Sequence, residues 1–156
     1  MASYTGEFPS TVDAKGRFLL PAGLKKMIPV KEQKEFVVHR GIEKHLEMFT
    51  RKEWDKESEA VNKLNQYVKR NREFIRIFNR GATVITLDPN NRLLVPKTLL
   101  DFASIEKDIV LFTYSNKIEI WSQVEFDKMM KDNSVDYSKL AEDVMGNKQT
   151  DGDRLS

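Results

Sequence analysis

The chain has 156 residues, 40% of them hydrophobic and 10% aromatic, which is enough apolar material to close a core of ordinary domain size. It contains no cysteine, and this excludes a disulfide framework, a thiolate nucleophile and cysteine-bound zinc. The net charge of +2 is too small for the whole surface to attract polyanions, but residues 1–80 hold 17 Lys and Arg against 11 Asp and Glu. No window approaches the roughly 18 apolar residues of a membrane span, and the N-terminal residues lack the pattern of a signal peptide, so we expect a soluble cytoplasmic protein.

The first half of the chain is repeated in the second half. At a constant offset of 75 residues, seven of the 19 positions that start at Gly6 carry identical residues, so VDAKGRFLLP at 12–21 matches LDPNNRLLVP at 87–96. After a small change in length, FVVHR at 36–40 matches IVLFT at 109–113, and LEMF at 46–49 matches IEIW at 118–121. Self-similarity of this kind predicts that one structural unit occurs twice.

Each unit is predicted to begin with two strands joined by a tight turn. The turns at 14–16 and 89–91 contain residue types that tolerate positive φ, namely glycine and asparagine, so each can reverse the chain between an alternating strand and an apolar one. The runs FLL and LLV that follow are continuously apolar, which favours short strands covered on both faces. Pro21 and Pro96 end these strands, and short helices are expected over residues 22–27 and 97–103.

Two longer strands and a helix complete each unit. TRKE at 50–53 and SQVE at 122–125 are typical of capping boxes, and Trp54 and Phe126 follow them at equivalent places. Strands as short as those after the turns cannot bury themselves, but two units packed together can. We therefore predict an α+β fold, mainly β, in which the two units form one small closed β-barrel with pseudo-twofold symmetry and peripheral helices.

Residues 51–80 are predicted to be helical, either as two helices or as one helix broken near Asn71. Two stripes recur there at helical spacing, one apolar and one basic. The apolar stripe consists of Val61, Leu64, Val68, Ile75 and Phe78, and the basic stripe of Lys69, Arg72, Arg76 and Arg80. The basic stripe has three open interpretations: a solvated helix face, contact with phosphate, or packing against another subunit. Beyond Lys131 the chain is polar and poorly periodic, and we expect a largely flexible tail.

The sequence offers few side chains that are arranged for catalysis. His39 and His45 have no metal-ligand spacing around them, so no metal site is predicted. The sequence has no glycine-rich phosphate cradle, nucleophile elbow or HExxH motif. We therefore predict a protein that is not an enzyme and that has no cofactor and no small-molecule substrate.

The repeated turn is the strongest candidate for function, because each copy exposes a cation at a bend. In the first turn Gly16 lets the backbone approach a duplex, Lys15 offers a charge to phosphate, and Arg17 can present its planar guanidinium to phosphate or guanine. The second turn offers Asn90, Asn91 and Arg92 in the same region. Asparagine side chains can donate and accept at base edges, so both turns are candidate contacts with double-stranded DNA.

The same spacing also has a purely structural explanation. Asp13 lies four residues before Arg17, and Asp88 lies four residues before Arg92, so each aspartate can latch its turn. The two interpretations stay open at this point, and they are compatible if the aspartate orients an arginine that touches DNA. Each neutralised phosphate contributes a salt slope of only about −0.9, so one subunit with three turn cations binds weakly. Useful affinity requires several copies on one DNA, which predicts a homo-oligomer.

Several groups of residues, taken together, are more specific than any one of them. They are YTGE at 4–7, DAKGR at 13–17 with Pro21, RIFNRGA at 76–82, residues 88–92 with Pro96, and IEIW at 118–121. A single D-x-x-x-R is a weak signal, but two at matched positions, each followed by apolar residues and proline, are specific. In these residues the chain, from about Tyr4 to Met130, resembles the MraZ family of bacterial transcriptional regulators.

The resemblance implies two SpoVT-AbrB-like swapped-hairpin repeats at 4–54 and 80–130, a helical connector at 55–79 and a tail at 131–156. It also implies a nucleoid-associated ring of several subunits. Such a ring binds direct repeats in double-stranded DNA upstream of the division and cell-wall genes, at its own promoter, and usually represses transcription there.

The DNA-contacting turn of the family carries over to specific residues of this chain. They are Asp13, Lys15, Gly16 and Arg17 in the first half, and Asp88 and Arg92 in the second. The second turn departs from the family pattern, because Asn91 stands where a glycine commonly precedes the arginine. Asparagine still tolerates the left-handed conformation, so we expect the geometry to be kept and the DNA contact to be weaker than in the first turn.

Two other functions stay open. Antitoxin-like relatives use the same fold as a protein-interaction module, although the tail here has no strong amphipathic stripe for a partner. RNA binding is compatible with the charge, but no platform of aromatic residues surrounds the turns.

Overall fold

The computed structural model describes residues 3–132 and 136–146, and the elements occur in the same order in both repeats. The first repeat consists of β1 (Gly6–Thr11), β2 (Arg17–Leu19), α1 (Ala22–Lys25), the 3₁₀ turn η1 (Val30–Glu32), β3 (Glu35–Arg40), β4 (Leu46–Thr50) and α2 (Arg51–Asn62). After α3 (Lys69–Asn79), the second consists of β5 (Thr83–Thr86), β6 (Arg92–Leu94), α4 (Lys97–Phe102), β7 (Asp108–Tyr114), β8 (Lys117–Ser122) and α5 (Gln123–Asp132). The fold is therefore α+β, as predicted.

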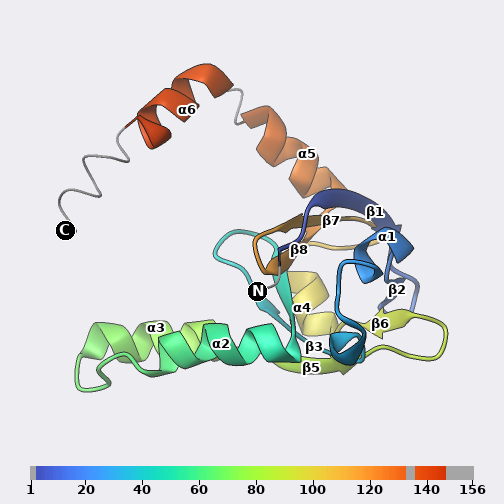
Figure 1. The fold of residues 1–156 in the computed structure, drawn as a ribbon, viewed down its shortest axis with the longest axis horizontal. Coiled ribbons are helices and arrows are strands. Elements are labelled where there is room, and N and C mark those ends of the chain that lie inside the picture. The colour runs from blue at the N-terminus through green and yellow to red at the C-terminus, as the bar shows by residue number, and fades with distance from the viewer. Residues whose placement is uncertain (1–2, 133–135, 147–156) are drawn as a thin grey trace. The chain divides into compact units, whose positions relative to one another are not determined.

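Six strands form one antiparallel sheet in the order β1-β7-β8-β4-β3-β5, and β2 pairs with β6 in a separate two-stranded ribbon (Figure 1). By the repeat, β1 is equivalent to β5, β3 to β7 and β4 to β8. Exchanging each of these strands for its equivalent gives the same sheet order read in reverse. The first strand of each repeat pairs with the other repeat, because β1 pairs with β7 and β5 pairs with β3. The repeats are thus intertwined about a local twofold axis. The assignment of each unit to the AbrB-like swapped-hairpin class stays a prediction.

Strand register places the axis between two pairs of equivalent residues. In the sheet, Glu47 of β4 lies opposite Glu119 of β8. In the ribbon, Phe18 of β2 lies opposite Leu93 of β6. A residue of one repeat that lies near these pairs is therefore close to the equivalent residue of the other repeat.

The sheet is open, so the predicted closed barrel is wrong. Strands β1 and β5 are the two edges, and they do not pair with each other. The ribbon strands do not bridge this gap, because each is only three residues long and forms its ladder with the other. A single bridge between Val12 and Phe18 joins β2 to the end of β1.

One hydrophobic core contains equivalent residues of both repeats. The matched pairs are Phe18 with Leu93, Leu20 with Val95, Leu24 with Leu99, Phe36 with Ile109, Val38 with Leu111, Leu46 with Ile118, and Met48 with Ile120. Burying one side chain of this size contributes about 1.5–3 kcal/mol relative to leaving it exposed, so the duplicated apolar pattern accounts for the intertwined packing.

The ribbon is covered on one face only, so the predicted burial of both faces is wrong. Phe18 and Leu93 are buried, whereas Leu19 is 55% exposed and Leu94 is 53% exposed. Side chains alternate between the two faces of a strand, so a continuous apolar run places some of its side chains outward unless a second layer covers them. The described part of the chain supplies no such layer here.

The connector consists of two helices, and the break does not lie near Asn71. Helices α2 and α3 run side by side and extend away from the ribbon (Figure 1), and Asn79 donates from Nδ2 to Asn62 Oδ1 at 3.1 Å. The chain reverses at 63–68, where Asn65 Oδ1 accepts from the Tyr67 N–H at 3.0 Å. An asparagine that bonds its own backbone two residues on favours a turn over a helix, which explains the earlier break.

Both predicted caps occur at the starts of α2 and α5. Thr50 Oγ1 accepts from the Glu53 N–H at 3.2 Å, and Ser122 Oγ accepts from the Glu125 N–H at 3.4 Å. Trp54 and Phe126 follow and are both buried. The matched caps show that the repeat extends to the helix after the last strand.

The C-terminal part forms a second compact unit, Phe126–Ser156, that is described by itself. It contains α6 (Tyr137–Met145) within the segment that we predicted to be a flexible tail; residues 133–135 and 147–156 of that prediction lie outside the described residues. The division into 4–54, 55–79, 80–130 and 131–156 stays a prediction. Among the described helices, none combines the length and apolar character that crossing a membrane requires.

Candidate nucleic-acid interface

The first turn is latched by Asp13. Its Oδ1 accepts from the backbone N–H groups of Lys15 at 3.0 Å and Arg17 at 2.9 Å, and its Oδ2 accepts from Arg17 Nε at 2.8 Å. One carboxylate thus closes the bend and orients the guanidinium. These bonds, the largest contribution coming from the Arg17 backbone N–H, hold the pKa of Asp13 below its ordinary value, so the latch is ionised at neutral pH.

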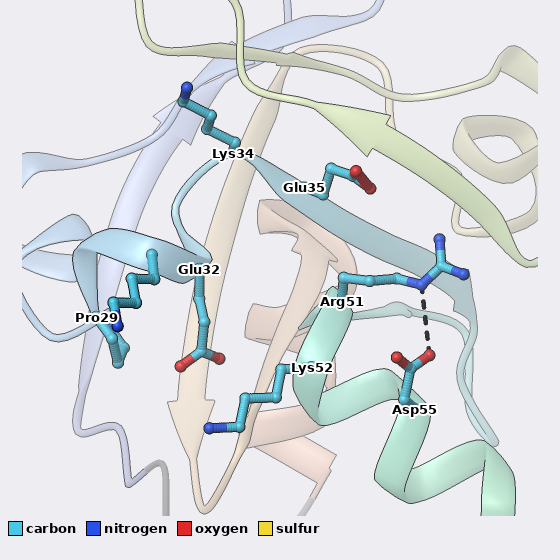
Figure 2. Close-up of a pocket in the computed structure, with 8 residues that line it drawn as sticks. Pro29, Glu32, Lys34, Glu35, Arg51, Lys52 and Asp55 are labelled. Carbon is cyan, nitrogen blue, oxygen red and sulfur yellow. Dashed lines mark hydrogen bonds and ion pairs between the residues drawn. The ribbon is translucent and has the colours of Figure 1, made fainter.

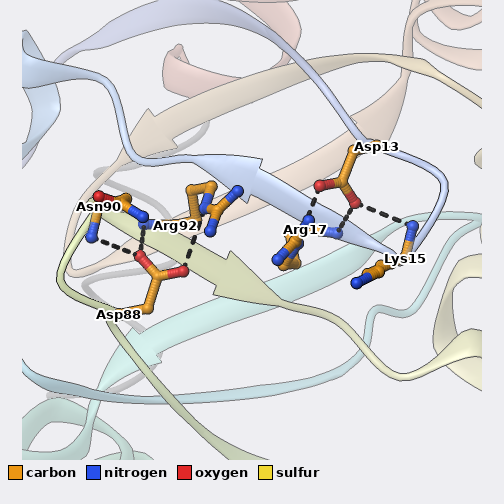
Figure 3. Close-up of polar contacts among 6 residues, drawn as sticks. All are labelled: Asp13, Lys15, Arg17, Asp88, Asn90 and Arg92. Carbon is orange, nitrogen blue, oxygen red and sulfur yellow. Dashed lines mark hydrogen bonds and ion pairs between the residues drawn. The ribbon is translucent and has the colours of Figure 1, made fainter.

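The second turn repeats the same geometry with Asp88. Its Oδ1 accepts from the N–H groups of Asn90 and Arg92, both at 2.8 Å, and its Oδ2 accepts from Arg92 Nε at 3.1 Å. The pKa of Asp88 is lowered in the same way, first by the Arg92 backbone N–H. Figure 3 shows the two latches at the start of β2 and of β6. In both copies, then, the aspartate makes the turn-closing bonds that the D-x-x-x-R spacing allows.

The latch leaves most of each guanidinium available. Within residues 3–132 and 136–146, the guanidinium groups of Arg17 and Arg92 bond their aspartates through Nε alone. The terminal nitrogens can still donate to a phosphate or to a guanine edge, and the planar group is already oriented. A latch and a DNA contact are thus compatible in one residue.

Positive φ occurs where the sequence allows it. Gly16 has φ +89° and Asn91 has φ +62°, so asparagine adopts the left-handed conformation in the second turn as expected. The Gly16 carbonyl accepts from the Val95 N–H at 2.9 Å, and an added Cβ at Gly16 would lie 2.9 Å from Val95 O. Glycine is thus needed at 16 for close approach of the other repeat, in addition to any approach of DNA.

The ribbon brings both arginines to one surface. Because Phe18 and Leu93 point into the core, alternation places the side chains of β2 and β6 on either side of them outward. Those outward residues are Arg17, Leu19, Arg92 and Leu94. The predicted turn residues of the two repeats, 75 positions apart in sequence, therefore form one continuous surface.

Sequence reasoning missed Lys25. This residue of α1 donates from Nζ to Asn91 Oδ1 at 2.8 Å and so holds the side chain of the second turn. The second turn has Asn90 at the position equivalent to Lys15 and so lacks that positive charge. Lys25 supplies a positive charge at this turn instead. No signal in the repeat indicates this, because the residue equivalent to Lys25 in the second half is the apolar Leu100.

The basic stripe of α3 is not brought to the ribbon. Figure 1 shows the α2–α3 hairpin extending away from β2 and β6. Lys69 Nζ lies 3.9 Å from Glu73 Oε1, and Arg72 Nη1 donates to the Gln66 carbonyl oxygen at 2.8 Å. Both residues therefore have partners within the α2–α3 hairpin. Arg76 and Arg80 are exposed near the other end of α3. Phosphate contact and subunit packing by this stripe stay predictions.

One large pocket lies outside the candidate site. It is an open hollow of about 770 Å³ between η1, β3 and α2 (Figure 2). Arg51 Nε pairs there with Asp55 at 3.3 Å, and Glu32 Oε1 accepts from Thr50 Oγ1 at 2.8 Å. None of the predicted turn residues lines it.

A second cluster, around His45, lies on the local twofold axis. His45 is 2% exposed, its ring stacks on Trp121, and its Nε2 lies 3.3 Å from both Glu47 Oε2 and Glu119 Oε2. Burial alone lowers the pKa of His45, but the hydrogen bonds to Glu119 and Glu47 outweigh it and raise the pKa to about 9. Despite burial, the pKa of Glu47 is lowered, first by His39, whose Nε2 lies 3.4 Å from Glu47 Oε1, and then by His45, and the pKa of Glu119 is lowered first by His45. The imidazole is therefore a buried cation at neutral pH.

The three ligand atoms of this cluster lie within 4.8 Å of one another, which is a spacing that can hold a metal ion. The ion pairs already give both carboxylates partners, and Lys117 Nζ adds a further contact 3.5 Å from Glu47. A signal for the cluster existed in the sequence, since Glu47 and Glu119 stand at matched positions between apolar residues in LEMF and IEIW.

Comparison with known proteins shows which family this chain belongs to. A family model described as "MraZ protein, putative antitoxin-like" matches the chain twice, over residues 4–77 and 78–148. The chain belongs to the MraZ family. The protein named "Transcriptional regulator MraZ" from Flavobacterium psychrophilum is 43% identical over 152 residues, which cover 97% of each chain. The proteins of the same name from Christiangramia forsetii and Cytophaga hutchinsonii are 40% and 38% identical, over 97% and 91% of this chain and 99% and 94% of theirs.

The names of these MraZ relatives describe a regulator of transcription rather than an enzyme. The two matches of the family model meet within α3, so each MraZ segment contains one latched turn.

Proposed function

We propose that the protein is a DNA-binding transcriptional regulator that uses its two latched turns to contact duplex DNA. The observation that carries this proposal is the ribbon, which presents Arg17 and Arg92 on one outward surface across a twofold axis. The major groove is about 12 Å wide and admits a two-stranded β-ribbon. The names of the MraZ relatives support regulation of transcription as the role.

The assembly and its target belong to the same proposal. One subunit offers few cations on the ribbon, so tight binding requires several subunits on one DNA. We therefore propose a cytoplasmic, nucleoid-associated ring of AbrB-like subunits whose neighbours meet direct repeats about 10 bp apart on one face of the duplex. Its operator is the protein's own promoter, upstream of the division and cell-wall genes, and binding represses transcription.

Footprinting on DNA immediately upstream of the gene, combined with mass measurement of the free particle, tests this proposal. We expect protection repeating at about one helical turn and a mass of several subunits. Excess duplex of the same sequence should compete, whereas structured RNA should not. A strictly monomeric particle, or no protection even at low ionic strength, contradicts the proposal.

Lys15→Ala is expected to weaken binding to all DNA sequences by a similar factor. The Lys15 side chain is exposed beside the latch, and a point charge there neutralises phosphate without reading a base. The slope of log K against log salt should fall by about one for each phosphate contact that is lost. Titrations at several salt concentrations measure this, with Lys52→Ala on α2 as a control that leaves the slope unchanged.

The description of the family model as antitoxin-like favours one second candidate, a protein-interaction module. Purification of the full chain from its native host distinguishes the two. One stoichiometric protein partner, without retention of operator DNA, would support the module and not the regulator.

A further inference from the structure

The outward face of the ribbon carries two apolar side chains as well as two arginines. Leu19 and Leu94 occupy equivalent positions in the two repeats, and each is more than half exposed. Register places Leu19 directly opposite Arg92 and Leu94 directly opposite Arg17. Each latched arginine is therefore paired with a leucine that comes from the other repeat.

Both leucines lie beside the turns. The Cδ1 atom of Leu94 lies 3.7 Å from the position of a Cβ on Gly16, so this leucine packs on the first turn. Leu19 lines a hollow of about 400 Å³ together with Lys25 and Asn91 of the second turn. Each leucine still exposes more than half of its surface, and exposing branched side chains at two symmetric positions costs free energy that a binding partner can recover.

The neighbouring groups indicate the chemistry of that partner. Arginine guanidinium groups at both ends of the face favour the edges of guanine and phosphate. In the major groove the one exposed apolar group on a base is the C5 methyl of thymine. Directly opposed residues of a ribbon have Cα atoms about 4.5–5.5 Å apart, which lies between one and two of the roughly 3.4 Å steps of a duplex, so a leucine and its arginine can reach neighbouring base pairs.

We propose that Leu19 and Leu94 are specificity-determining residues that contact thymine methyl groups next to the bases contacted by Arg92 and Arg17. This inference rests on the proposed function, because it requires the ribbon to enter the major groove. Each turn then reads a short mixed sequence, in which the arginine of one repeat and the leucine of the other recognise adjacent base pairs.

Replacing single thymines of the operator with deoxyuridine tests the proposal, because it removes only the methyl group. We expect at least one such replacement in each repeat to weaken wild-type binding by about fourfold, the factor that corresponds to burying one methyl carbon. With Leu19→Ala or Leu94→Ala, binding to the thymine operator should weaken. Each variant should also lose its response to deoxyuridine at one position while keeping the response at the other.

The control is Ile42→Ala, since Ile42 is 96% exposed in the loop between β3 and β4, outside the ribbon strands. This variant should respond to deoxyuridine as the wild type does. Unchanged wild-type affinity at every replaced thymine overturns the inference and leaves the proposed function standing. A change of particle mass in Leu19→Ala, with the deoxyuridine response intact, also overturns it and assigns the leucines to a subunit interface. No wild-type binding to the thymine operator overturns the proposed function itself.

Discussion

Arg17→Ala is expected to abolish retardation of promoter DNA while the melting temperature and the particle mass stay near those of the wild type. The backbone N–H groups of Lys15 and Arg17 keep their bonds to Asp13 in this variant, so the turn stays closed. The lost Nε–Oδ2 bond belongs to a solvent-exposed pair, and such pairs contribute little to stability. One arginine–guanine pair accounts for about 5- to 150-fold in affinity, and a ring loses it in every subunit at once.

Arg51→Ala is the matched control for this variant. Arg51 forms the same kind of pair, from Nε to an aspartate four residues away, at 3.3 Å on α2. Its loss should affect neither DNA binding nor particle mass. Arg92→Ala should weaken binding in the same direction as Arg17→Ala, and by less if the second turn contacts DNA more weakly. Unfolding of Arg17→Ala would assign the arginine to the latch alone, and full retention of DNA binding would remove it from the interface.

The repeat explains why much of this fold could be predicted. Identical residues at a constant offset fix which elements are equivalent, and the residue types at 16 and 91 fix where the chain reverses. The latch was one of two interpretations that the D-x-x-x-R spacing left open. Spacing alone could not separate them, because one carboxylate can orient an arginine that is also free to bind elsewhere.

What could not be predicted depends on pairing between distant strands. The closed barrel fails because β2 and β6 pair across the axis, and local sequence does not encode that partner choice. The outward leucines were misjudged for the same reason, since a continuous apolar run does not reveal which faces a second layer covers. The cluster around His45 joins residues about 72 positions apart, and only the register of β4 against β8 brings them together.

The free energy of unfolding is expected to fall by about 3 kcal/mol as the pH is raised from 6.5 to 9. The pKa of His45 is raised from 6.5 to about 9 in the folded chain, so over this range the folded state binds a proton that the unfolded state has released. The stabilisation is therefore complete below pH 6.5 and is lost as the pH rises through 9. Chemical denaturation at a series of pH values measures it.

Several titratable groups face this cluster, among them His39, whose Nε2 lies 3.4 Å from Glu47 Oε1. The pKa of Lys117, next to the cluster, is raised above its ordinary value of 10.5, and that of Tyr4 is raised by burial to about 12, so both titrate at higher pH. Glu47 and Glu119 titrate at lower pH, because their values are depressed. His45→Gln should give a flatter profile than the wild type between pH 6.5 and 9. If that variant folds poorly, an NMR titration of the wild-type His45 ring gives the midpoint directly, and a value at or below 6.5 contradicts the ion-pair network on the axis. A midpoint near 9 would instead confirm that a charged His45 bridges the two carboxylates that the duplication places face to face.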